Sequence, residues 1–318
     1  MSFSKNVKEE LSRQISPARH CQIAEIAAII SLCGDIIIND RNEHFIKIHT
    51  ENLTVARKYF ILIRKSFHVA AEISVRRNNN LKKSNVYTVW IKDAEISMKI
   101  LQATKLIDQD GEIREELSIT DNLVVQNACC RRAFIRGAFL AYGSMSDPAK
   151  NYHFEIVTST RKKAEQLRDI INFFQMDAKI VQRKNHFVVY VKEGSQIVDL
   201  LNIMEAHVSL MELENVRIIK EMRNSINRQV NCETANINKT VVAASKQIDD
   251  IIYIRDTIGF HELSEALEEI AKIRIEQPDA SLKELGTLLN PPIGKSGVNH
   301  RLRKLSMIAD NLREEKEK

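Results

Sequence analysis

The sequence predicts an α+β protein in which a duplicated, pseudo-two-fold domain shaped as a saddle precedes an all-α domain. Two stretches within residues 24–193 repeat the same order of segments, and the last third of the chain reads as helices only. Glycine (9), proline (5) and aromatic residues (6%) are too scarce for a large β-barrel or a disordered chain. With 318 residues, 44% of them hydrophobic, the chain can form two or three domains with buried cores.

The repeat consists of matched segments that keep their order. The matched pairs are AEIAAIISLCGDI (24–36) with AFIRGAFLAYGSM (133–145), HFIKIHT (44–50) with HFEIVTS (153–159), FHVAAEISVRRN (67–78) with FQMDAKIVQRKN (174–185), and YTVWIKD (87–93) with FVVYVKE (187–193). Gly34 and Gly143 are 109 positions apart, and the two His-Phe pairs keep that offset. Each copy reads as helix, strand, helix, strand, strand, helix. The small residues of the two first helices predict that these helices pack closely against each other.

The net charge and the cysteine count exclude few classes of function by themselves. A net charge of +5 permits a polyanionic partner without requiring one. The chain has five cysteines, Cys21, Cys33, Cys129, Cys130 and Cys232. They form no C-x-x-C pair, and no clustered histidine lies at zinc-ligand spacing from them. We therefore expect no structural metal and no cofactor, and reduced thiols in a cytoplasmic protein.

The beginning of the chain and its most apolar stretch do not predict a membrane protein. Phe3, Val7 and Leu11 have helical spacing, which indicates an amphipathic helix within residues 1–20 rather than a signal peptide. Residues 23–33 are interrupted by Glu25 and are too short to cross a bilayer. We expect no membrane partner.

The C-terminal third predicts a group of short helices. Residues 228–239 are polar and lack a hydrophobic face, so we expect them to be a linker. Ser281 and Glu284 have the spacing of a capping box at the start of a short helix. The following Asn290-Pro291-Pro292 cannot continue that helix.

The final helix separates its apolar residues from its basic ones. Val298, Leu302 and Leu305 form one stripe, and the segment 290–309 contains four basic residues and no acid. A helix pair, a proline-marked turn and this charge pattern predict a helix-turn-helix whose second helix enters the major groove of DNA. Arginine and asparagine can pair with base edges, and lysine with phosphates. The candidate DNA-contacting residues are Ser281, Lys283, Lys295, Ser296, Asn299, His300, Arg301, Arg303 and Lys304. A solvated helix face is the alternative.

A basic segment in the first repeat offers accessory DNA contacts. Arg76, Arg77, Lys82 and Lys83 lie where the second repeat has only a short turn around Lys184. Four cations on a hairpin can bind phosphates, although a solvated loop is the alternative interpretation.

Two helices that end in glycine, each followed by a β-hairpin, resemble the LAGLIDADG homing-endonuclease fold over residues 20–205. In that family an acidic residue directly before each glycine binds the catalytic divalent cation. Cys33 and Tyr142 occupy these positions here, and the nearby carboxylates of Asp35 and Asp147 are displaced from them. The resemblance implies a scaffold without catalytic residues, and a nuclease with relocated ligands is the alternative.

Longer strings resemble the WhiA family and together span nearly the whole chain. They are SFSKNVKEEL (2–11), CCRRAFIRGAFLAYGSMSDPAKNYHFEIV (129–157), RNSINRQVNCETAN (223–236) and SLKELGTLLNPPIGKSGVNHRLRKL (281–305). The resemblance implies a non-enzymatic, sequence-specific transcriptional regulator of Gram-positive bacteria, tied to sporulation or cell division and associated with the nucleoid. Its implied partner is double-stranded DNA, with other regulatory proteins as further partners of the N-terminal domain. A residual endonuclease and an interaction scaffold with incidental DNA contact are the alternatives.

The expected domain organisation combines the repeat with the resemblance. The expected parts are residues 1–20 (amphipathic helix), 21–110 (first LAGLIDADG-like repeat), 111–227 (second repeat and trailing helix), 228–239 (linker), 240–312 (helix-turn-helix domain) and 313–318 (charged tail).

Overall fold

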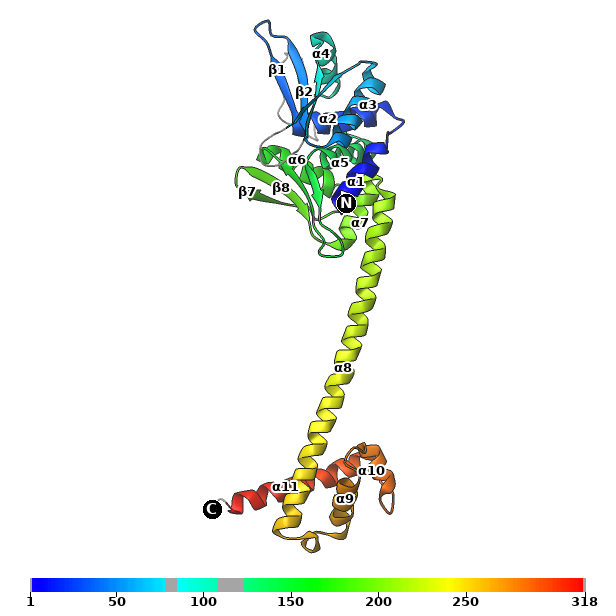
Figure 1. Ribbon diagram of the computed structural model, residues 1–318, viewed down its shortest axis with the longest axis vertical. Helices are drawn as coiled ribbons and strands as arrows, with labels where there is room; N and C mark the ends of the chain where they lie inside the picture. Colours follow the sequence, from blue (N-terminus) through cyan, green and yellow to red (C-terminus); the bar gives the residue numbers. More distant parts are fainter. Residues whose placement is uncertain (1, 78–84, 108–122, 317–318) are drawn as a thin grey trace. The chain divides into compact units, whose positions relative to one another are not determined.

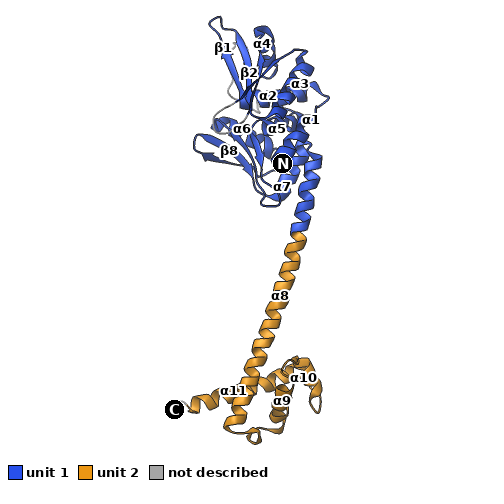
Figure 2. Cartoon of the chain, viewed as in Figure 1, with its two compact units in different colours: residues 1–220 blue, residues 221–318 orange. Residues whose placement is uncertain are grey.

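The computed structural model describes residues 2–77, 85–107 and 123–316 (Figure 1). The chain divides into two compact units, unit 1 (residues 1–220) and unit 2 (residues 221–318), which Figure 2 shows in blue and orange. Among the described residues, every helix is too short or too polar to cross a membrane.

Unit 1 contains two copies of one α+β arrangement, as the sequence predicts. The first copy comprises α2 (Arg19–Cys33), β1 (Gly34–Ile38), β2 (His44–Thr50), α3 (Leu53–Phe67), β3 (Glu72–Arg77), β4 (Asn85–Ile91) and α4 (Ala94–Ala103). The second comprises α5 (Ala128–Tyr142), β5 (Gly143–Met145), β6 (Phe154–Thr158), α6 (Arg161–Asn172), β7 (Lys179–Arg183), β8 (His186–Val191) and α7 (Gly194–Met204), and the short helix η1 (Leu123–Val125) precedes it. The strand orders, β1-β2-β4-β3 and β5-β6-β8-β7, are equivalent, and all neighbouring strands are antiparallel.

Each copy has one strand more than the pattern of hydrophobic residues predicts. β1 and β5 begin at Gly34 and Gly143, immediately after the first helices, and pair with β2 and β6. The apolar run before each glycine belongs to the helix, so its periodicity hides the change to an extended backbone. The resulting hairpins agree with the LAGLIDADG-like resemblance.

The helices α2 and α5 pack against each other at the centre of unit 1 (Figure 1). Both helices are buried on almost every side. At Gly137 of α5, an added Cβ would lie 2.6 Å from the Glu25 carbonyl oxygen and 3.0 Å from the Ala28 side chain of α2. The small residues therefore allow the close approach that the sequence predicts.

A charged cluster lies inside this packed interface. The Glu25 carboxylate of α2 is fully buried and accepts hydrogen bonds from the Arg136 guanidinium of α5 at 3.2 and 3.3 Å. The buried ammonium of Lys58, from α3, lies 3.1 Å from the same carboxylate. Arg136 also donates to Glu205 at 2.6 Å, beyond the end of α7. One carboxylate thus connects the two repeats with α3.

The N-terminal helix α1 (Phe3–Arg13) completes unit 1. Phe3, Val7 and Leu11 are buried, which confirms the amphipathic helix. The Glu10 carboxylate accepts hydrogen bonds from the backbone N–H groups of Val208 and Ser209, at 2.7 and 2.9 Å. An acidic side chain of α1 therefore caps the first turn of α8 (His207–Thr257).

Residues 228–239, the expected linker, are helical, because they lie within the continuous 51-residue helix α8. All side chains from 221 to 243 are exposed, which explains the lack of a hydrophobic face. The helix contains neither glycine nor proline, so no residue in it breaks the backbone pattern. The polar composition therefore indicated exposure of these side chains but not the helical backbone.

Unit 2 has a core of its own. Residues of α8 such as Ile251 and Ile254 pack with α9 (Glu265–Glu276), α10 (Leu282–Leu288) and α11 (Lys295–Lys316), and η2 (Phe260–Glu262) joins α8 to α9. The expected charged tail, from residue 313, begins inside α11. Its first residue, Arg313, forms an ion pair at 2.7 Å with the buried Asp250 of α8.

We expect Glu25→Gln to destabilise unit 1 by about 3–5 kcal/mol, because Lys58 and Arg136 would stay buried without a carboxylate. The measurement is urea unfolding followed by fluorescence of Trp90, the only tryptophan, which lies in β4. Glu95→Gln removes a carboxylate from an exposed pair with Lys99 and is the control, with no measurable change expected. Equal midpoints for the two variants would show that the buried cluster contributes no stability.

Gly286→Ala is expected to destabilise unit 2 by about 1–3 kcal/mol. An added Cβ at Gly286 would overlap the carbonyl oxygen of Ile293, in the turn between α10 and α11. Gly294 is the matched control: it has nothing within 4 Å of an added Cβ and no positive φ, so Gly294→Ala should preserve stability. Differential scanning calorimetry of the full chain measures both, and a similar loss in both variants would contradict the packing argument.

Candidate nucleic-acid interface

The helices α10 and α11, with the turn between them, form the predicted helix-turn-helix. The capping box at the start of α10 is present: Ser281 Oγ accepts from the Glu284 backbone N–H at 3.3 Å, and Glu284 Oε2 accepts from the Ser281 N–H at 2.8 Å. Ser281 is exposed, but its hydroxyl oxygen already accepts this hydrogen bond. Its first role is therefore to fix the start of α10.

The turn between the two helices is fixed by backbone hydrogen bonds. The Ile293 N–H donates to the Gly286 carbonyl at 3.0 Å, which ties the turn to α10. The Asn290 N–H donates to Glu269 Oε1 of α9 at 2.8 Å. The turn thus sets the angle at which α11 leaves α10.

One side of α11 is buried and the opposite side is polar and exposed. Val298, Leu302, Leu305 and Ala309 are the buried stripe. At roughly 100° per residue, the side chains opposite this stripe include Ser296, His300, Arg303 and Lys304, and all four are exposed. We call these four residues the outer face of α11. Lys295 and Lys283, at the starts of α11 and α10, are also exposed.

Two of the predicted contact residues lie at the flanks of α11 instead. Arg301 is half-buried; its Nη1 donates to the Ala266 carbonyl of α9 at 3.3 Å and lies 3.9 Å from Glu269 Oε2. Asn299 is also partly buried and lines a hollow of about 220 Å³ with Lys239 and Gln247 of α8. In this structure Arg301 therefore helps to hold α9 against α11.

Unit 1 does not offer ligands for a hard divalent cation at the positions implied by the LAGLIDADG-like fold. The Cys33 thiol is buried and donates to the Ile29 carbonyl at 3.1 Å, and burial raises its pKa to about 12. Burial, with Cys33 and Asp35 nearby, also raises the pKa of the half-exposed Tyr142. A protonated thiol and a phenol do not replace carboxylates as ligands for magnesium.

The surroundings of these two residues add positive charge. Lys8 lies in the same hollow, of about 980 Å³, as Cys33 and Tyr142, and burial lowers the Lys8 pKa to about 8. Asp35 is mostly exposed and faces His49 at 3.6 Å, while Asp147 accepts a hydrogen bond from the Ala149 N–H. These side chains therefore do not supply the pair of carboxylates, one before each glycine, that would hold a catalytic cation.

The predicted accessory contacts lie only partly within the described residues. Arg76 and Arg77 are exposed at the end of β3, opposite Val86 and Asn85 of β4. Lys82 and Lys83 lie outside the residues that the structure describes.

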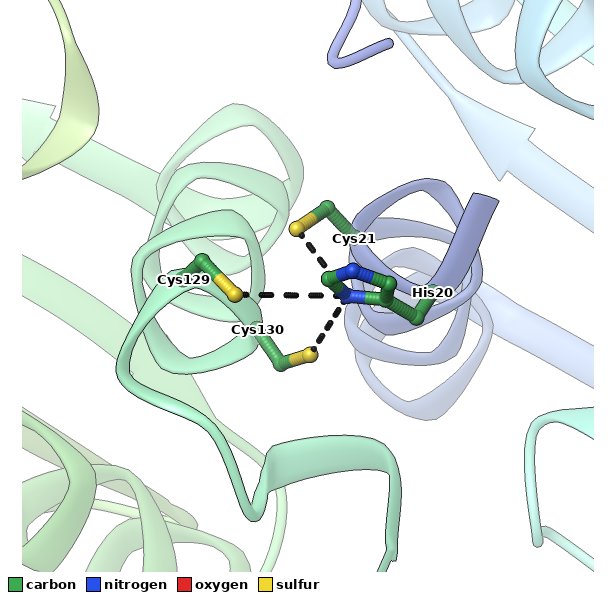
Figure 3. A group of neighbouring side chains, drawn as sticks. All are labelled: His20, Cys21, Cys129 and Cys130. Carbon is green, nitrogen blue, oxygen red and sulfur yellow. Dashed lines mark hydrogen bonds between the residues drawn. The ribbon is translucent and has the colours of Figure 1, made fainter. Parts of the chain in front are cut away.

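The structure also brings together four side chains that the sequence analysis did not connect. His20 and Cys21 of α2 meet Cys129 and Cys130 of α5, at the N-terminal ends of the two central helices (Figure 3). Spacing along a single stretch gave no sign of this cluster. The repeat offset did contain the signal, because His20 and Cys129 are themselves 109 positions apart.

Comparison with known proteins covers both units. Three family models match: the WhiA N-terminal LAGLIDADG-like domain over residues 19–107, the WhiA LAGLIDADG-like domain over 131–223 and the WhiA C-terminal HTH domain over 226–309.

Similar whole proteins are found among curated and solved ones. A probable cell division protein WhiA of Lachnoclostridium phytofermentans is 61% identical, over 99% of this chain and 100% of its own. One from Alkaliphilus oremlandii is 52% identical, over 99% of each chain. The crystal structure of full-length WhiA from Thermatoga maritima has a TM-score of 0.60 and 24% identity, over 98% of this chain and 99% of its own, and thus shares the fold. With matching models in both repeats and in the helix-turn-helix, and a relative of this similarity along its whole length, the chain belongs to the WhiA family.

Proposed function

We propose that this protein is a sequence-specific DNA-binding regulator of transcription that acts in cell division or sporulation and cleaves no DNA. The observation that supports this proposal is the outer face of α11, where basic and hydrogen-bonding side chains lie exposed on the second helix of a helix-turn-helix. Relatives named as probable cell division proteins support the cellular role. Action on chromosomal DNA in the cytoplasm follows from this function.

The residues of α11 divide between base reading and support. Arg303 and His300, on the outer face, are the proposed readers of base edges. Lys304, Lys295 and Lys283 bind phosphates and orient the helix. Arg301 and Asn299 support the helix from its flanks, because each already faces α9 or α8.

Unit 1 contributes accessory contacts in this proposal. The exposed Arg76 and Arg77 of β3 bind phosphates without reading sequence, together with Lys82 and Lys83. We further propose that unit 1 binds another regulatory protein.

Arg303→Ala should weaken binding to a target duplex by about 1–3 kcal/mol and relax its sequence preference, because it removes a base-reading guanidinium. The target is selected by this protein from a random-sequence DNA pool, and binding is measured by fluorescence anisotropy. Arg255→Ala is the matched control, since Arg255 is exposed in unit 2 but pairs with its neighbour Asp256 at 2.8 Å. If both variants bind equally well, α11 does not read the sequence.

Lys304→Ala should weaken binding to target and unrelated duplexes alike. Because log K falls as log salt rises, removing one phosphate contact should make this negative slope less steep by roughly 0.9. The slope is measured between low and physiological salt, with Lys272→Ala of α9, which pairs with Glu268, as the control. An unchanged slope for Lys304→Ala would exclude its contact with phosphate.

Supercoiled plasmid should remain intact after incubation with the full-length protein and magnesium or manganese, because Cys33, Tyr142 and Lys8 replace hard ligands. Agarose gel electrophoresis detects nicked circles. Nicking by the wild-type protein that disappears in Asp35→Asn would contradict the non-catalytic function and support the relocated-ligand nuclease.

A further inference from the structure

Four metal-ligating side chains converge at one point in unit 1 (Figure 3). His20 Nδ1 lies 3.2 Å from Cys130 Sγ, 3.4 Å from Cys21 Sγ and 4.0 Å from Cys129 Sγ. All four ligand atoms lie within 4.8 Å of one another. The thiols of Cys21 and Cys130 are buried, while His20 and Cys129 are exposed at the edge of the cluster.

These distances match a single tetrahedral ion. Zinc bonds of about 2.3 Å to sulfur and about 2.0–2.1 Å to nitrogen place neighbouring ligand atoms roughly 3.5–3.8 Å apart at tetrahedral angles. The three distances from His20 Nδ1 to the sulfur atoms span 3.2 to 4.0 Å, and all four ligand atoms lie within 4.8 Å of one another, so the ligands must move by about 1 Å or less to surround one ion. An iron–sulfur cluster needs ligands spread around several metal atoms, which this closely spaced set does not provide.

The helix ends around the cluster favour negatively charged ligands, whereas burial raises the pKa of the Cys21 and Cys130 thiols as long as no metal is bound. His20 and Cys21 lie in the first turn of α2, and Cys129 and Cys130 in the first turn of α5. The positive ends of two 15-residue helix dipoles therefore point toward the sulfur atoms. Three thiolates and one imidazole are a common ligand set for structural zinc.

The cluster follows the internal symmetry of unit 1. Adding the repeat offset of 109 to His20 gives Cys129, and adding it to Cys21 gives Cys130. Each repeat thus supplies an equivalent pair, and the point of convergence lies between the two helices. It is at the opposite helix ends from Cys33 and Tyr142, and therefore separate from the positions of the lost catalytic ligands.

We propose that His20, Cys21, Cys129 and Cys130 bind one Zn²⁺ ion, which joins the N-terminal ends of α2 and α5. With four protein ligands the site is closed, so the ion stabilises the pairing of the repeats and activates no water. This inference departs from our expectation of no structural metal, which considered only ligand spacing within single stretches. It does not depend on the proposed DNA-binding function.

The first test is the metal content of the full-length protein, expressed with added zinc, desalted and measured by inductively coupled plasma mass spectrometry. We expect about one zinc ion per chain. Cys130→Ser should lower the content to near zero, whereas Cys232→Ser, which changes an exposed cysteine of α8, should keep it. Equal zinc in both variants, or a wild-type protein without zinc, would overturn the proposal.

A second measurement distinguishes the loss of a zinc ligand from the loss of the fold. His20→Ala and Cys129→Ser change exposed ligands, and circular dichroism checks their folding. Each should bind zinc at least about tenfold more weakly than the wild type, measured by competition with a chromophoric chelator. Unchanged affinity in both variants would exclude these two ligands.

Cobalt identifies the ligands directly, because Co²⁺ in a tetrahedral thiolate site absorbs strongly in the visible range and has sulfur-to-metal charge-transfer bands. These bands should appear when Co²⁺ alone is added to the metal-depleted wild-type protein, and should weaken in Cys129→Ser but not in Cys232→Ser. An iron–sulfur absorption spectrum of the purified protein, or a disulfide among these cysteines found by mass spectrometry, would overturn the zinc assignment.

Discussion

Glu25 receives two cationic side chains inside unit 1, Lys58 from α3 and Arg136 from α5. Burying three charged groups is unfavourable unless they neutralise and hydrogen-bond one another, and here they do so in one fixed arrangement. Arg136 comes from the second repeat, whereas Glu25 and Lys58 come from the first. The cluster therefore supplies a directional contact between the two repeats, in an interface where small and apolar residues pack closely. The equivalent strand orders of the two sheets follow the internal repeat of the sequence.

The Glu25 cluster lies between the two ends of the helix pair, and the side chains at these ends differ in chemistry. At the C-terminal ends, Cys33, Tyr142 and Lys8 line one hollow, and none of these side chains is a carboxylate that could bind magnesium. At the N-terminal ends, thiols and an imidazole form a soft ligand set beside positive helix termini. The two ends of the same helix pair therefore present different chemistry: no carboxylate directly before either glycine at one end, and soft ligands at the other. A structural ion at the N-terminal ends would reinforce the interface that contains Glu25.

Much of this architecture was predictable because it is periodic. The repeat offset, the amphipathic α1 and the capping box of α10 all appear as spacings in the sequence, and the structure confirms each. The features that were missed depend on partners remote in the chain. The contact of Arg301 with α9 could not be predicted from the sequence, because the carbonyl that accepts its hydrogen bond, that of Ala266, is 35 residues away; its contact with DNA remains a prediction. The central part of α8 has the composition of a linker because its side chains are exposed in the described structure, although its backbone is helical.

The position of Arg301 limits what α11 can achieve alone in the proposed function. Its outer face offers the permanent cations Arg303 and Lys304, with Lys295 and Lys283 near the helix starts. Each phosphate contact releases roughly one counterion, so a small set of cations gives modest affinity at physiological salt. Stable binding at a chromosomal site then needs cations from elsewhere. In the proposed function the exposed Arg76 and Arg77 would be a source of such cations, and phosphate contacts made by them would add affinity without altering the sequence that α11 selects.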